Sequence, residues 1–73
     1  MNRFLEVDTE KLRRLRRRAA LSQQELARRA GTTQETISRL ERGHHDARGK
    51  TLRRLAKALG VEPRELMKGE DDA

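Results

Sequence analysis

The sequence is 73 residues long, with 18 Lys and Arg against 12 Asp and Glu and a formal net charge of +6. Hydrophobic residues make up 33% of it and charged residues 41%, with one Phe and no Cys, Trp or Tyr. A chain of this length forms one small domain. The absence of cysteine excludes a disulfide framework and a thiol nucleophile. No apolar run approaches the roughly 18 residues of a membrane span and no signal peptide is visible, so we expect a cytoplasmic protein.

The basic residues are concentrated in the middle of the chain. Residues 11–57 contain 15 of the 18 Lys and Arg but four of the 12 Asp and Glu, a local net charge of +11. This concentration indicates a protein that binds a polyanion, although a solvated arginine-rich surface would give the same counts. We predict one domain over residues 8–68, with an N-terminal arm at 1–7 and a disordered acidic tail at 69–73.

Five helices are predicted, and no strand. The first begins after the N-cap residue Asp8, where Val7 and Leu12 are spaced as a hydrophobic staple. The second begins after Ser22, and Glu25 completes a capping box with it. Both starts combine an N-cap residue with apolar residues at helical spacing, which favours two amphipathic helices.

The three later helices have similar signals. The third begins after Thr33 and is expected to stop at Gly43. The fourth covers about 48–59 and has Gly60 as its C-terminal cap. The fifth is short and begins near Pro63, a residue that suits the first turn of a helix.

The most specific pattern joins the second and third helices. Ala27, Gly31, Ile37 and Leu40 occupy relative positions 5, 9, 15 and 18 of a unit that begins at Gln23. A small residue lets two helices cross closely, glycine permits the left-handed backbone of a tight turn, and two apolar residues bury one helix face. The pattern predicts a helix-turn-helix whose second helix leaves its outer face free for the major groove of DNA.

Three segments, residues 21–27, 31–43 and 51–61, resemble the Cro/repressor-type (lambda repressor-like, XRE-type) helix-turn-helix family. Their sequences are LSQQELA, GTTQETISRLERG and TLRRLAKALGV, and the match covers roughly residues 11–67. The resemblance implies an all-α, compact five-helix lambda repressor-like domain with the helix-turn-helix at the second and third helices. It further implies a sequence-specific transcriptional regulator of the repressor type, which binds double-stranded operator DNA with inverted half-sites as a homodimer.

By the same resemblance, Gln23 contacts phosphate, and Gln34, Glu35, Ser38 and Arg39 face base edges or the flanking backbone. The side-chain chemistry agrees, since Gln can pair with adenine, Arg with guanine, and Glu with the amino group of cytosine. Glu35 and Arg39 are also spaced to form an ion pair on the helix surface. Both roles of Glu35 remain open.

Further candidates flank the third helix. Thr33 is first a helix cap, but the amides at that helix start also suit phosphate. His44 is expected to contact phosphate or solvent, because His44 and His45 alone cannot complete a metal site. Lys50 can reach the DNA backbone or minor groove. The predicted DNA-binding set is Gln23, Thr33, Gln34, Glu35, Ser38, Arg39, Arg42, His44 and Lys50.

A second set of residues has a structural role. The resemblance implies an internal tie between Arg16 and Glu41, as opposed to Arg16 belonging to an exposed arginine run. Ala20 stands where the family often has glycine, so the first helix either ends in a strained cap or continues. The structural set is Arg16, Glu41, Ala27, Gly31, Ile37 and Leu40.

Two alternative functions are compatible with the sequence, one that involves DNA binding and one that does not. An antitoxin would bind its own promoter and a protein partner, and an accessory helix-turn-helix protein would act through protein contacts alone. The density of Lys and Arg argues against a protein that acts through protein contacts alone, because a protein-binding surface would favour apolar anchor residues. We expect neither an enzyme nor a cofactor, because the sequence has no catalytic carboxylate pair in a plausible cleft and no phosphate-binding glycine loop. The regulator is expected in the cytoplasm, associated with the nucleoid, without membrane contact.

Overall fold

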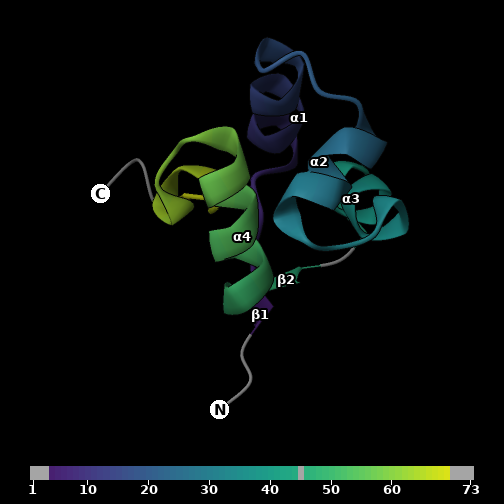
Figure 1. Ribbon diagram of the computed structural model, residues 1–73. Coiled ribbons are helices and arrows are strands. Elements are labelled where there is room, and N and C mark those ends of the chain that lie inside the picture. The colour runs from purple at the N-terminus through teal and green to yellow at the C-terminus, as the bar shows by residue number, and fades with distance from the viewer. Residues whose placement is uncertain (1–3, 45, 70–73) are drawn as a thin grey trace.

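The computed structural model describes residues 4–44 and 46–69, and these residues form a bundle of helices with a small sheet (Figure 1). The α-helices are α1 (Thr9–Arg18), α2 (Gln23–Ala30), α3 (Gln34–Glu41) and α4 (Gly49–Leu59). A 3-10 helix, η1 (Pro63–Leu66), follows α4. The sheet is formed by β1 (Phe4–Leu5) and β2 (Ala47–Arg48), which pair antiparallel.

Two sequence-based predictions need correction. The five-helix count is not confirmed, because the described residues contain four α-helices and the fifth element is a 3-10 helix of four residues. This element ends where Met67 turns to an extended conformation (φ −97°, ψ 136°) and bridges Val7. The prediction of no strand is wrong: Leu5 pairs with Ala47, and strands of two residues are too short for an alternating pattern to reveal them.

The predicted helix starts are confirmed. The side chain of Asp8 accepts a hydrogen bond from the amide of Lys11 (3.1 Å), so α1 has its N-cap. Ser22 and Glu25 form the complete capping box of α2, with distances of 2.8 and 3.0 Å. The pKa of Glu25 is lowered, chiefly because its carboxylate accepts a hydrogen bond from the backbone of Ser22. These local bonds satisfy amides that the helices cannot.

The core lies where the helices converge, and α2 packs against both α3 and α4. Every α-helix and η1 contribute a leucine or isoleucine to it. The six largest fully buried side chains are Leu12, Leu26, Ile37, Leu52, Leu55 and Leu66. Burial of such a side chain contributes about 1.5–3 kcal/mol, which explains how a chain with 33% hydrophobic residues folds.

Residues 4–8 lie against the domain and connect two of its distant parts; we call them the N-terminal clasp. At one end β1 pairs with β2, directly before α4. At the other end the amide of Asp8 donates to the carbonyl of Leu66 (2.8 Å), and the amide of Lys68 donates to the carbonyl of Glu6 (2.9 Å). Val7 is buried between them, 6% exposed. Of the predicted tail, residues 70–73 lie outside the described residues.

Candidate nucleic-acid interface

Helix α3 has one buried face and one exposed face. Ile37 and Leu40 point into the core and are 0% and 2% exposed. Helical spacing places Glu35, Ser38 and Arg39 on the outward face, and Glu35 and Arg39 are exposed while Ser38 is half-buried. Gln34, at the first turn of α3, is exposed too. The structure therefore brings these four candidate side chains together on one accessible helix surface.

The turn between α2 and α3 has the geometry that its residue types require. Ala27 is 3% exposed, at the packing surface of α2. Gly31 ends α2 in the left-handed conformation (φ 69°, ψ 34°), and the amide of Thr32 donates to the carbonyl of Ala27 (2.9 Å). A side chain at that φ would be strained. After this turn Thr33 caps α3 by accepting from the amide of Thr36 (3.1 Å).

Glu41, the last residue of α3, is held by side chains from two other helices. Arg16 of α1 donates from Nε to Oε2 (2.6 Å) and from Nη2 to Oε1 (3.0 Å). Arg16 also donates from Nη1 to the carbonyl of Leu21 (2.9 Å). Arg13 donates to the backbone carbonyl of Glu41 (2.8 Å). The C-terminal end of α3 is thus fixed to α1 by two arginines, one of which forms the ion pair that the family resemblance implies.

Gln23 joins the same network from α2. Its Nε2 donates to Oε1 of Glu41 (3.1 Å), and its side chain is half-buried. An amide NH₂ has two donors, so the bond to Glu41 leaves one of them for a phosphate. The structure thereby gives Gln23 a structural role that the sequence pattern does not reveal.

The charges in this network fix its ionisation. Burial would raise the pKa of Glu41, but hydrogen bonds from Arg16 and Gln23, and the charges of Arg16 and Arg13, lower it below its ordinary value. The pKa of Arg16 is raised, first by its hydrogen bond to Glu41. Glu41 is 4% exposed and its side chain is fully partnered. The pair is therefore ionised at neutral pH and connects α1, α2 and α3.

Arg39 and Glu35 form an ion pair on the outward face of α3. Nη2 of Arg39 lies 2.9 Å from Oε2 of Glu35, and the two side chains are 48% and 71% exposed. Exposed pairs of this kind contribute about 0–1 kcal/mol. Arg39 can therefore exchange Glu35 for a guanine or a phosphate at little cost.

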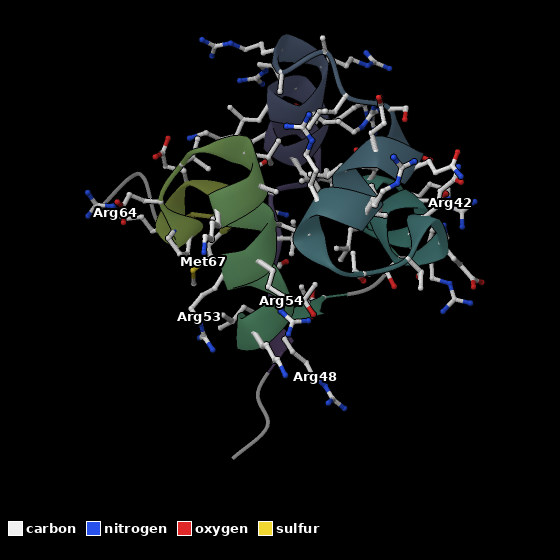
Figure 2. The ribbon with its side chains drawn as sticks, in the orientation of Figure 1. Arg42, Arg48, Arg53, Arg54, Arg64 and Met67 are labelled. Atoms are coloured by element: carbon white, nitrogen blue, oxygen red, sulfur yellow. The ribbon has the colours of Figure 1, made fainter. Side chains whose placement is uncertain are left out.

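The remaining candidates surround α3. Arg42 is exposed directly after the end of α3 and projects outward from that part of the molecule (Figure 2). His44 is exposed in the following loop, and Lys50 is exposed in the first turn of α4. A shallow pocket separates α3 from the start of α4, with Leu40 and Ala47 buried in it and Thr36 and Thr51 among its polar residues. Arg39 is the candidate residue that lines this pocket, which lies between the outward face of α3 and the start of α4.

Sequence reasoning missed several contacts of this surface. Thr9 donates to the carbonyl of Leu40 (3.0 Å), which adds a third tie between α1 and the end of α3. Arg13 donates a hydrogen bond to Glu41, but its residue type does not distinguish it from the other arginines of the same segment. Its position three residues before Arg16, on the same helix face, was the available signal.

The described part of the chain contains no group of three or more His, Cys, Asp or Glu that could hold a metal ion. None of the described helices is long and apolar enough to span a bilayer.

Comparisons with known proteins agree with this geometry. An uncharacterised HTH-type transcriptional regulator of Sinorhizobium fredii is 44% identical over 59 residues, which are 81% of this chain and 77% of that protein. Among solved structures, the restriction-modification controller protein C.AhdI of Aeromonas hydrophila is 37% identical, with a TM-score of 0.77 over 81% of this chain and 89% of that one. The P22 c2 repressor, solved in complex with a synthetic operator, is 33% identical, with a TM-score of 0.79 over 84% of this chain and 92% of that one.

The fold and the exposed outer face of α3 define a helix-turn-helix domain. The model of the helix-turn-helix family matches residues 12–66. The chain belongs to this family and is of its Cro/C1-like type.

Proposed function

We propose that the protein is a DNA-binding transcriptional regulator that binds a specific operator with α3 in the major groove. The observation that carries this proposal is the two-faced α3: Ile37 and Leu40 are buried, while Gln34, Glu35, Ser38 and Arg39 are accessible side by side. A helix of this kind, held from behind by the preceding helix, has the dimensions that the major groove admits. The relatives named as transcriptional regulator and repressor support the same function.

Each accessible side chain has its own task in this proposal. Gln34 pairs with adenine, Arg39 with guanine or a phosphate, and Ser38 and Glu35 contact adjacent base edges. Gln23, Arg42, His44 and Lys50 contact phosphates on the two sides of the groove, and the amides after Thr33 do so at the start of α3. Phosphate contacts orient the domain and base contacts supply specificity.

We propose further that the regulator binds as a homodimer and represses transcription. One domain presents a single short helix to DNA and so distinguishes few base pairs, whereas a dimer places two such helices one helical turn, roughly 34 Å, apart. The half-exposed Met67, which follows η1, is the candidate centre of the interface.

The proposal is tested by selecting bound duplexes from a random pool. We expect an enriched motif with two inverted halves, and we expect Gln34→Ala to broaden the motif at one position in each half. The matched control is Gln24→Ala, because Gln24 is an exposed glutamine of α2 that is not among the candidate contacts. Enrichment of no motif by the wild-type protein would contradict the proposed function, and a single unrepeated half-site would contradict the homodimer.

A further inference from the structure

A second basic surface lies outside the candidate interface, at the junction of α2 and α4. It consists of four exposed cationic side chains, which we call the α2–α4 basic surface: Arg28, Arg29, Arg54 and Lys57. They line one shallow depression with Ala30, Gly31 and Ala58, and no acidic residue lines it. Arg28 and Arg29 lie one helical turn after Glu25, and their charges help to lower its pKa.

The arrangement concentrates charge from two helices that are far apart in sequence. The guanidinium of Arg54 lies over the turn after α2, where a β-carbon on Gly31 would be 3.8 Å from Nη1. Figure 2 shows Arg54 on the side of α4 that faces α2, whereas the neighbouring Arg53 projects from the other side. Arg54 therefore lies at van der Waals distance from the turn that follows α2, and the last turn of α2 carries Arg28 and Arg29.

The surface is continuous with the candidate interface along α4. Lys50, Arg54 and Lys57 follow one another at spacings of four and three residues, so they form one exposed stripe of the helix. Lys50 is the proposed phosphate contact at the N-terminal end of this stripe. The stripe is about 10 Å long, so a DNA strand that runs along it brings more than one phosphate to its cations. A DNA backbone that contacts Lys50 can therefore contact Arg54 and Lys57 as well.

Helix electrostatics explain part of this surface. Arg28, Arg29 and Lys57 lie in the last turns of their helices, where a positive charge is favourable. Arg54 lies in the middle of α4 and gains nothing from that effect. Glu25 offsets part of the charge of Arg28 and Arg29, but no acidic residue lines the depression beside Arg54 and Lys57.

We propose that the α2–α4 basic surface binds DNA phosphates beyond the half-site contacted by α3. The inference rests on the proposed function, and it adds a sequence-independent contact to it. The phosphates belong to the flanks of the same duplex, because the exposed stripe of α4 continues from Lys50, the proposed contact at the half-site. Each phosphate contact contributes about 0.9 to the slope of log affinity against log salt concentration.

The test uses the triple variant Arg28→Gln/Arg54→Gln/Lys57→Gln on the operator extended by about one helical turn, roughly 10 base pairs, on each side. We expect its salt slope to fall by about 2–3, that is, about 0.9 for each phosphate that the variant no longer binds. The matched control, Arg14→Gln/Arg17→Gln/Arg18→Gln, removes the same charge from exposed residues of α1 and should keep the wild-type slope. Equal slopes for the two triple variants would overturn the proposal.

Two further arms complete the experiment. The double variant Arg28→Lys/Arg54→Lys, with Lys57 unchanged, should retain the slope, because a phosphate requires the charge and not the guanidinium. A change in slope that disappears on an operator without flanks supports the proposal, whereas capture of a labelled random duplex by immobilised operator would overturn it in favour of a second duplex. Failure of the proposed function can be distinguished from failure of this inference. In the first case the wild-type protein would show no preference for the selected motif, while the salt slopes could still be measured.

Discussion

Ala20 is the one described residue other than glycine with a positive φ, at 58°. It follows the C-cap Ala19 of α1 and directs the chain toward Leu21, whose amide donates to the carbonyl of Arg16 (3.1 Å). The left-handed conformation costs an L-residue about 1–2 kcal/mol and costs glycine little. Of the two outcomes that the sequence left open for this position, the strained cap is present and the longer helix is not.

Replacing Ala20 with glycine should therefore stabilise the protein, by about 1 kcal/mol. For a domain of this size that corresponds to a rise of about 4–8 °C in the melting temperature. Ala19→Gly is the matched control, because Ala19 has an ordinary helical conformation (φ −81°) and glycine there adds only flexibility. The measurement is the melting temperature of both variants and of the wild type. A melting temperature of Ala20→Gly below that of the wild type would show that Ala20 is not strained.

At the scale of the elements, the network around Glu41 fixes α3 relative to α1 and α2. Arg16→Ala removes one partner of a pair whose side chains are 12% and 5% exposed. Breaking a buried pair leaves an unpaired charge and costs about 3–5 kcal/mol when burial is complete, so we expect about 3 kcal/mol here. Arg17→Ala, which removes an exposed neighbour, should change stability by less than about 0.5 kcal/mol. Equal unfolding free energies in urea would show that the pair does not hold the helices.

The same network predicts a pH dependence. The pKa of Glu41 is lowered in the folded protein, so its contribution is complete above the ordinary glutamate pKa of about 4.3 and is lost as pH falls through the lowered value. The melting temperatures of wild type and Glu41→Gln should differ most near neutral pH and converge in acid. A difference that stays constant down to about pH 3 would mean that the ionised carboxylate contributes nothing.

The N-terminal clasp makes a prediction of its own. If residues 4–8 hold the segment before α4 in place, Leu5→Ala should destabilise the protein by about 1 kcal/mol, since Leu5 is half-buried against the core. Glu6→Ala is the control, because Glu6 is exposed and forms a weak ion pair with Lys68 (3.9 Å). Unfolding curves that coincide for Leu5→Ala and the wild type would indicate a free arm.

At the scale of the whole molecule, the sequence predicted what depends on local patterns. The caps at Asp8, Ser22 and Thr33 and the inward positions of Ile37 and Leu40 follow from residue type and helical spacing. Contacts between distant segments could not be predicted from the sequence. The β1–β2 pairing, for example, joins residues more than 40 positions apart through backbone atoms, which every residue type has. Gln23 was assigned to phosphate from the family alone, and its bond to Glu41 became visible only in three dimensions.

The proposed dimer is tested by the mass of the complex in solution. We expect two chains per operator in sedimentation equilibrium, and we expect Met67→Asp to weaken this stoichiometry. Because Met67 also packs against the core, circular dichroism is used to show that the variant is folded. The control is Lys68→Asp, at the exposed neighbouring position. One chain per operator at saturating protein would contradict the homodimer without affecting the assignment of α3.

The assignment of α3 as the specificity helix is tested most directly by comparing matched and scrambled DNA at several salt concentrations. Gln34→Ala should lose about 1–3 kcal/mol of discrimination, since a bidentate pair with a base is removed, and keep its salt slope, since a neutral amide releases no counterion. Lys50→Ala should do the opposite: it should weaken binding to matched and scrambled DNA alike and reduce the salt slope by about 0.9. If Gln34→Ala instead lost affinity equally for matched and scrambled DNA, α3 would not be the helix that distinguishes the operator.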